Sequence, residues 1–392
     1  MRPARAWLAA MVCAIAATSA ASAQKEKALE IPKRPRLERG ADTNNASAYY
    51  YQGMTWLRKT PAEAAAAFYW ASRLDPSWAE PLYARRIAFH MSDLERFRKY
   101  LAGARYVIDS REVRHADSLL LKAMLRNPYV YRQLDRILIE ELLRDENGTP
   151  GLFVTTDPEF EGWLAYASGK FDRAIESYGR ALRKKPDAHD LHESRAQAFY
   201  MVTQFDSAVA EMGKAIDGLR KEDEKRVTYL YESSAMYEYT AGMALLHAEK
   251  LDAARGAFGR ALAEDLSFYM AHAKLGALAL ALGDSASAAT EYGLAVDLSP
   301  DDAALRYEYA LLLGNRGQYD EALTHLKKAT ESEPYFAPPY LALATVYDDG
   351  GFSEQAVASY TAYLARAPSN PAMMVRIRKR VSELAPASAP PP

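Results

Sequence analysis

The residues most suggestive of metal chemistry form the sequence HDLHE, in which His189, His192 and Glu193 lie close together. Imidazole nitrogens and carboxylate oxygens are common zinc ligands. However, the spacing matches neither H-E-x-x-H nor H-x-x-E-H, and no third, distant ligand is evident. We therefore predict no metal site here and expect His192 to point at a neighbouring helix.

Other catalytic signatures are missing from the sequence. It contains no G-x-S-x-G, P-loop or G-x-G-x-x-G motif, and the other histidines are scattered along the chain. Carboxylates are abundant, but solvated helix faces account for them. We therefore predict no catalytic residue, no cofactor and no enzymatic activity. The alternative is an enzyme whose active site lies undetected in residues 79–154.

The composition is that of a folded protein without a strong charge. Of the 392 residues, 49% are hydrophobic and 26% are charged, which excludes general disorder. The formal net charge is −2, too small to attract nucleic acid or anionic lipid. We therefore predict no nucleic-acid partner.

The N-terminal segment 1–23 has the pattern of a secretory signal peptide. Arg2 and Arg5 precede the apolar stretch Ala6–Ala20, and a small-x-small cleavage site follows at residues 21–23. The apolar stretch is alanine-rich and too short for a spanning helix. We expect a periplasmic or secreted mature chain without a membrane span. Cleavage would also remove Cys13, the only cysteine, so the mature chain would have no thiol chemistry.

Alanines recur at a fixed period and indicate the elements that organise the chain. The spacing is constant, apart from one longer step after the second, along Ala174, Ala208, Ala254, Ala288, Ala322 and Ala356. A bulky residue follows each one four positions later, on the same helical face. A glycine or alanine also occurs twelve positions before each of these alanines. It indicates a second helix, whose small residue forms a notch that lets a neighbouring helix approach closely. Short turns separate the helices, and proline ends several of the pairs.

This pattern resembles the tetratricopeptide repeat, whose signature is W-x2-L-G-x2-Y, then A-x3-F, then P at a period of about 34 residues. Gly162 with Tyr178 and Pro186 matches it, as does Gly276 with Tyr292 and Pro300. The resemblance implies an all-α fold, a right-handed α-solenoid of stacked helix-turn-helix repeats. It also implies a scaffold that binds a protein or peptide.

The pattern divides the chain into segments. We predict a signal peptide at 1–23, a flexible basic linker at 24–45, a first repeat at 46–78, a divergent helical region of degenerate repeats at 79–154, six repeats at 155–370 with an insertion near 218–229, a capping helix at 371–384 and a disordered tail at 385–392. A divergent helical insert is the alternative for 79–154. The charged insertion is expected to extend a helix.

In this family, the first helix of each repeat lines the inner surface of the stack. We call the predicted binding residues on these helices the inner stripe: Trp163, Tyr166, Gln197, Tyr200, Tyr239, Met243, His247, Lys274, Tyr307, Leu311 and Asn315. Aromatic and methionine side chains bind extended peptides through large adaptable surfaces. The predicted function is therefore binding of a protein segment, in envelope assembly or export. Two alternatives stay open: the aromatic residues recognise a glycan or the cell wall, or they are core. The sequence predicts no oligomeric state.

Overall fold

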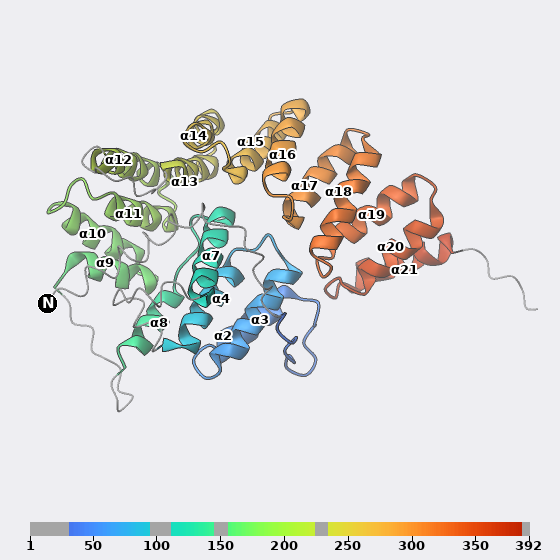
Figure 1. Ribbon diagram of the computed structural model, residues 1–392, viewed down its shortest axis with the longest axis horizontal. Coiled ribbons are helices and arrows are strands. Elements are labelled where there is room, and N and C mark those ends of the chain that lie inside the picture. The colour runs from blue at the N-terminus through green and yellow to red at the C-terminus, as the bar shows by residue number, and fades with distance from the viewer. Residues whose placement is uncertain (1–30, 95–110, 145–155, 224–233, 386–392) are drawn as a thin grey trace, which may run out of the picture. The chain divides into compact units, whose positions relative to one another are not determined.

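The computed structural model describes residues 31–94, 111–144, 156–223 and 234–385. These residues form 18 α-helices and no β-strand (Figure 1). The predicted signal peptide lies outside the described residues, as does the second half of the insertion near 218–229, residues 224–229. No helix in the described ranges is long and apolar enough to cross a membrane.

The helices follow one another as antiparallel pairs joined by short turns. The first part of the chain contains α2 (Ala46–Trp56), α3 (Pro61–Leu74), α4 (Glu80–Ser92), α7 (Arg111–Arg126) and α8 (Leu134–Leu142). The periodic part contains the pairs α9 (Pro158–Ala167) and α10 (Phe171–Leu182), α11 (His189–Met201) and α12 (Phe205–Asp223), α13 (Ser234–His247) and α14 (Leu251–Glu264), α15 (Tyr269–Ala281) and α16 (Ser285–Leu298), α17 (Ala303–Asn315) and α18 (Tyr319–Ser332), and α19 (Pro338–Asp349) and α20 (Ser353–Leu364), followed by α21 (Pro371–Leu384).

The chain divides into two compact units. Unit 1 contains Trp56–Ala65 and Ala79–Ala271, and unit 2 contains Arg34–Thr55, Ala66–Trp78 and the residues from His272 onward. In unit 1, each helix from α9 to α14 packs on the next, and α4 packs on α7 and α8. In unit 2, each helix from α16 to α21 packs on the next. The predicted all-α fold of stacked helical hairpins is confirmed.

Close approach of the paired helices explains the periodic glycines. A Cβ atom added at Gly242 on α13 would lie 2.5 Å from the ring of Phe258 on α14, well inside van der Waals contact. The same clash, at 2.7 Å, would occur between Gly162 and Tyr178 and between Gly276 and Tyr292. In these three hairpins, glycine leaves the space that the aromatic ring of the second helix fills.

In the pairs from α9 to α20, each turn places one residue in the left-handed backbone region. Gly283 (φ 82°) and Gly317 (φ 77°) occupy it in two repeats, whereas Thr203 (φ 60°) occupies it in another. The following amide donates to a carbonyl five residues earlier, as from Asp284 N to Ala279 O at 2.9 Å. This bond, the Schellman closure of a helix, ends the first helix and aims the chain into the second.

A polar pair joins the two helices of several hairpins at equivalent positions. His192 and Glu211 form such a pair in unit 1, and His272 and Glu291 form one in unit 2, both at 2.7 Å. Arg306 and His325 occupy the same positions at 3.0 Å. These pairs replace the signature tryptophan of the first helix with buried polar side chains that fix how the two helices pack.

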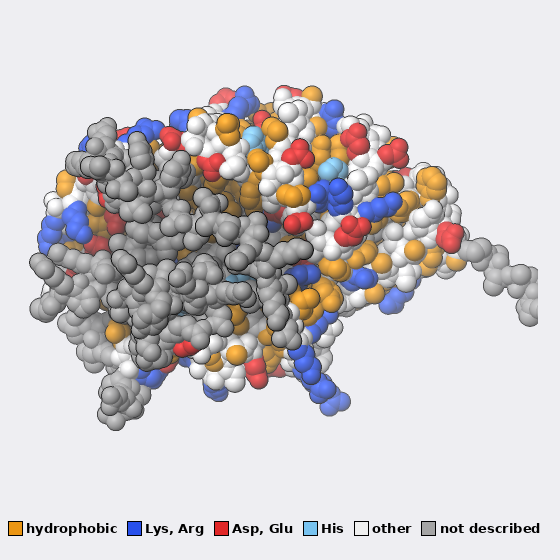
Figure 2. All heavy atoms as spheres, in the orientation of Figure 1, with side chains coloured by type: hydrophobic (Ala, Val, Ile, Leu, Met, Phe, Trp, Pro, Cys, Tyr) orange, Lys and Arg blue, Asp and Glu red, His pale blue; other side chains and the backbone are white. Residues whose placement is uncertain are grey.

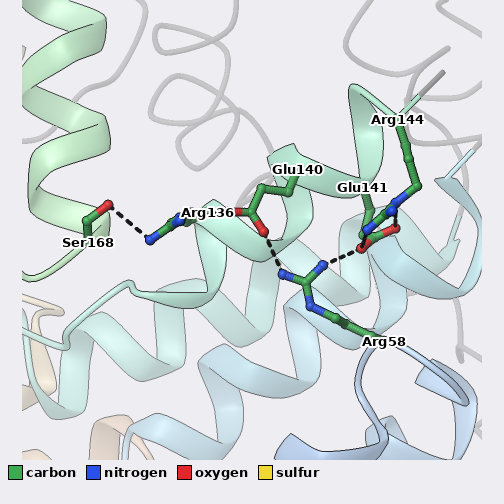
Figure 3. A network of polar contacts seen from close by, with 6 residues as sticks. All are labelled: Arg58, Arg136, Glu140, Glu141, Arg144 and Ser168. Carbon is green, nitrogen blue, oxygen red and sulfur yellow. Dashed lines mark hydrogen bonds and ion pairs between the residues drawn. The ribbon is translucent and has the colours of Figure 1, made fainter. Parts of the chain in front are cut away.

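An ion-pair network holds α8 in unit 1 (Figure 3). Arg58, just after α2, pairs with both Glu140 and Glu141. Arg136 pairs with Glu140 at 2.7 Å, and Arg144 pairs with Glu141 at 2.8 Å. Burial raises the pKa of Glu140, but its bonds to Arg58 and Arg136 outweigh this and lower it. The network therefore links α8 to the turn that follows α2.

In unit 2, residues early in the chain contact residues near its end. The guanidinium of Arg34 lies over the rings of Trp70 and Tyr335, 5.0 and 5.8 Å from their centres. The side-chain amide of Asn44 donates to the carbonyl of Ala365 at 3.0 Å, and Asp42 accepts from the amide of Ser369. These contacts fall partly within the predicted linker 24–45, whose flexibility stays a prediction.

Candidate functional site

The inner stripe is divided between the two units. Unit 1 holds Trp163, Tyr166, Gln197, Tyr200, Tyr239, Met243 and His247, and unit 2 holds Lys274, Tyr307, Leu311 and Asn315. All of them lie on the first helices of repeats, from α9 to α17. The two parts of the stripe have different surroundings and are described separately.

One repeat position shows the difference most directly. The residue that follows the small residue of each first helix is 7%, 3% and 9% exposed at Trp163, Gln197 and Met243 in unit 1. The equivalent Leu311 in unit 2 is 42% exposed. Ala277, which occupies this position in α15, is exposed as well. The stripe is therefore covered in unit 1 and open to solvent around Leu311.

The chain itself covers the stripe in unit 1, through the connection between α7 and α8. We call residues 127–133 (NPYVYRQ) the covering segment. Its Tyr129 is 2% exposed and stacks on Tyr200, with ring centres 3.6 Å apart and planes inclined by 3°. The hydroxyl of Tyr129 donates to the carbonyl of Thr240 on α13 at 3.0 Å. Burial raises the pKa of this hydroxyl, which stays a donor.

A second tyrosine of the covering segment contacts the preceding repeat, α9 and α10. Tyr131 packs edge-on against Tyr166 and Phe171, with ring centres 5.9 and 5.4 Å apart. Its hydroxyl donates to the carbonyl of Ala167 at 3.3 Å. Tyr166 is 4% exposed, and its own hydroxyl has no hydrogen-bond partner among the described residues. One polar atom of this surface is therefore left unsatisfied by the covering segment.

An arginine of the covering segment binds the polar part of the stripe. Arg132 donates to the side-chain oxygen of Gln197 at 3.1 Å, and the amide of Gln197 donates to the carboxylate of Glu193 at 3.0 Å. Burial lowers the pKa of Arg132, but the carboxylates of Asp135 and Glu193 outweigh it and raise the pKa. The guanidinium is therefore held, charged, in an acidic surrounding.

The remaining part of the stripe in unit 1 extends the same surface. Tyr239 is fully buried, and its hydroxyl donates to the carbonyl of Leu125 on α7 at 2.8 Å. Trp163 stacks on Phe160 with ring centres 5.4 Å apart. His247 is exposed and lies 3.3 Å from the hydroxyl of Tyr200. The structure thus brings together most of this half of the stripe, around the covering segment and α7.

The part of the stripe in unit 2 has a different character. Tyr307 is half-buried against Phe336, with ring centres 5.7 Å apart, and burial raises its pKa. Leu311 and Asn315 are exposed on α17, and Lys274 is half-buried on α15. On the face shown in Figure 2, apolar and charged side chains are interspersed over the described residues of unit 2.

Sequence reasoning missed the covering segment because it lies outside the periodic part of the chain. YRQLDRILIEELL has a helical pattern, yet the helix begins only at Leu134. Asn127 and Pro128 were the signal for a turn, since this pair breaks helices and starts turns. The alternation of Tyr129 and Tyr131 gave a second indication that the segment is not helical.

In the HDLHE sequence, both ring nitrogens of His192 contact oxygen atoms of the chain. Nδ1 of His192 lies 2.7 Å from the Glu211 carboxylate, and Nε2 lies 2.8 Å from the Pro186 carbonyl. Within the described residues, no group of three or more His, Cys, Asp or Glu side chains is arranged to hold a metal ion. His192 therefore does point at a neighbouring helix, α12.

A basic cavity of about 500 Å³ lies beside this histidine, between α10, α11 and α12. Arg183, Arg195, Lys214 and Lys221 contribute to its wall. Lys214 pairs with Glu211 at 2.8 Å, and Lys221 pairs with Asp187 at 2.7 Å. Arg195 also pairs with Glu211, at 3.4 Å. Three of the four cations are therefore already paired within the chain, and the cavity shows no specific ligand chemistry.

Comparison with known proteins gives a family match and structural likenesses. Sequence models of the tetratricopeptide repeat match residues 161–220, 239–303 and 303–336. No curated protein matches the chain significantly. The similar solved structures include a MamA protein (23% identity, TM-score 0.38, 45% of this chain and 90% of that one). They also include YrrB, described as a tetratricopeptide repeat protein with an unusual peptide-binding site (22%, 0.41, 53% and 100%), and PilF of Pseudomonas aeruginosa (17%, 0.43, 58% and 96%).

The matched residues coincide with the hairpins that the glycine notches and Schellman turns define. The matches run from α9 to α18 and are interrupted at 221–238, around the one longer step between the alanines. Family match, spacing and stacked hairpins agree, and residues 161–220 and 239–336 are therefore tetratricopeptide repeats.

Proposed function

We propose that this protein is a non-catalytic scaffold that binds an extended segment of another protein along the inner stripe of unit 2. Stacked repeats of this kind are protein-interaction scaffolds, because neighbouring first helices form one continuous surface. The residues proposed to make the contact are Lys274, Tyr307, Leu311 and Asn315.

The supporting observation is the contrast between equivalent positions in the two units. In unit 1, Gln197 is 3% exposed because a polypeptide segment covers it, whereas the equivalent Leu311 is 42% exposed. A leucine with this much exposed area gains hydrophobic free energy when a partner covers it. The same position that holds the chain's own segment in one unit is thus available to a partner's segment in the other.

Glycan recognition is less well supported by this arrangement. Sugar rings stack on exposed faces of aromatic side chains, but Trp163, Tyr166 and Tyr239 are 7%, 4% and 0% exposed. The exposed residues of the stripe in unit 2 are instead Leu311 and Asn315. An aliphatic side chain beside an amide suits a peptide, whose apolar side chains and backbone groups alternate.

Peptide selection with matched variants tests the proposal. A random displayed-peptide library is selected on the full chain, and the affinities of selected peptides are compared for Leu311→Glu and Leu294→Glu. Leu294 is 43% exposed on the second helix α16, so it is the control for adding the same charge at equal exposure. We expect Leu311→Glu to weaken binding by about tenfold or more, near ~1.4 kcal/mol, and Leu294→Glu to leave it unchanged.

Two results would contradict the proposal: equal binding by both variants, or selective capture of purified glycans presented in parallel.

We further propose that the protein acts in the cell envelope, in assembly or export. The support is the pattern of residues 1–23. N-terminal sequencing of the protein recovered from the producing cell should begin near Gln24, and an uncleaved N-terminus in the cytoplasm would exclude this location.

A further inference from the structure

The covering segment is held in the way that a peptide ligand is held. Tyr129 stacks flat on Tyr200, Tyr131 fits against Tyr166, and Arg132 binds Gln197. Both tyrosine hydroxyls donate to backbone carbonyls of the repeats, those of Thr240 and Ala167. The three side chains are therefore held by residues of α9, α10, α11 and α13.

We propose that the inner stripe of unit 1 is a recognition surface for a Tyr-x-Tyr-Arg segment, that residues 127–133 are its resident occupant, and that a partner protein carrying this chemistry binds by displacing them. The inference rests on the proposed function, since it assumes that the protein binds protein segments. It adds the chemistry of the segment and a second, closed site.

The charges of the subsites select an arginine in the position of Arg132. Glu193 is 8% exposed, Asp135 is 4% exposed, and both lie near the guanidinium. A buried carboxylate without a cation is costly, so a displacing segment must bring its own positive charge. The planar guanidinium also suits the Gln197 oxygen, to which it donates.

The resident segment leaves one hydrogen-bonding group of the surface unsatisfied, so another ligand can bind more tightly. The hydroxyl of Tyr166 is buried without a hydrogen-bond partner in the described part of the chain. A buried polar group without a partner is unfavourable, and a ligand that supplies one gains affinity. A partner segment with a polar group at this point would therefore bind more tightly than residues 127–133, and could overcome the advantage that tethering gives the resident.

The first experiment removes the main contacts of the covering segment, which gives the vacated variant, and adds the sequence of the segment as a free peptide. The full chain with Tyr129→Ala and Arg132→Ala is titrated with a fluorescent peptide of sequence NPYVYRQ, and anisotropy gives the affinity. A tethered occupant has an effective concentration on the order of millimolar, so wild type should bind the peptide weakly. We expect the vacated variant to bind it at least about tenfold more tightly.

Controls assign the binding to the proposed subsites. Gln197→Ala in the vacated background and a peptide with alanine in place of arginine should each abolish the gain. A scrambled peptide should not bind. Equal binding of NPYVYRQ by wild type and the vacated variant would overturn the proposal, as would a gain that persists with Gln197→Ala.

A second measurement keeps every contact side chain intact, in case the vacated variant does not fold. Val130 is 2% exposed, and Cys13 is the only cysteine, so Val130→Cys with Cys13→Ser gives one buried thiol. Its reaction with a maleimide reports how often the covering segment leaves the surface. Excess NPYVYRQ peptide should accelerate labelling by threefold or more, and the scrambled peptide should not. An unchanged rate at saturating peptide would contradict displacement.

Failure of this inference can be told apart from failure of the proposed function. Leu311→Glu lies in unit 2 and should leave both NPYVYRQ measurements unchanged. If library peptides require Leu311 but NPYVYRQ never binds the vacated variant, the covering segment is a structural part of unit 1 and only the site in unit 2 stands.

Discussion

At the scale of single residues, His192 shows how a buried polar group fixes a hairpin. Both ring nitrogens face acceptors, the Glu211 carboxylate and the Pro186 carbonyl. Both can donate to these oxygens at once only when each carries a proton, so this arrangement favours the imidazolium form. Burial lowers the pKa of His192, but the bonds to Glu211 and Pro186 outweigh it and raise the pKa. For Glu211, burial raises the pKa, but bonds to His192 and Lys214 lower it to about 2.

This pair predicts a pH dependence of stability. A histidine whose pKa is raised on folding stabilises the protein below its unfolded pKa, and this contribution is lost as pH rises through the folded pKa. We therefore expect His192→Gln to lower the free energy of unfolding by about 1–3 kcal/mol at pH 5 and by less at pH 8. Denaturant titrations of wild type and variant at both pH values measure the difference.

Glu211→Gln is the companion variant. It removes the charged acceptor, so it should lose the same pH-dependent increment between pH 5 and pH 8. A cost of His192→Gln that is equal at both pH values would show that the ring is neutral in the folded protein.

At the scale of elements, glycine sets how closely the helices of a pair approach. The ring of Phe258 occupies the space where a Cβ atom on Gly242 would lie, at 2.5 Å. Where the second helix presents an aliphatic side chain instead, as Leu326 on α18, the first helix carries Ala310. The methyl group of Ala310 is therefore accommodated beside Leu326.

Replacement of Gly242 by alanine should separate α13 from α14. Overpacking of this kind costs about 1–3 kcal/mol, which outweighs the gain in helix propensity. Gly259, in the interior of α14, is the matched control because a Cβ atom there would meet nothing within 4 Å. Gly259→Ala should stabilise by about 0.5–1 kcal/mol. Thermal unfolding of both variants measures these changes in stability. A Gly242→Ala variant as stable as wild type would contradict the close approach of α13 and α14.

Periodicity made this level of structure predictable from the sequence. Gly162, Gly276 and the recurring alanines indicated two helices per repeat and the positions of their contacts, because each hairpin repeats the same local physics. Tyr129 and Arg132 were not predictable as partners of Tyr200 and Gln197. Those contacts join a non-repeating connection to repeats 65 or more residues away, and no local pattern specifies such a pairing.

At the scale of the whole molecule, the two units differ in what their repeats do. In unit 1 the stripe is filled by residues 127–133, and in unit 2 Leu311 stays exposed. Unit 2 also contains contacts that repeat proteins do not need, between its early residues and residues 333–369. Stability in ordinary arrays comes from neighbouring repeats. Here the early residues add a contribution that no neighbour supplies.

Removal of that contribution should be detectable at a single amide. Asp42 accepts from the amide of Ser369. We expect Asp42→Ala to speed hydrogen exchange at Ser369 by about tenfold, which corresponds to about 1.4 kcal/mol. Asp75→Ala is the control, because the Asp75 carboxylate accepts from the nearby Ser77. It should leave Ser369 unchanged, and equal effects of both variants would mean that Asp42 stabilises unit 2 only indirectly.

These contacts also impose an order on biosynthesis. Asp42 and Ser369 are separated by 327 residues, so the ribosome makes the first long before the second. At about 5–20 residues per second, the interval is on the order of tens of seconds. Throughout it, the surface around Trp70 that Tyr335 later covers faces water or another protein. The hairpin of α2 and α3 therefore presents this surface uncovered until residue 335 has been made.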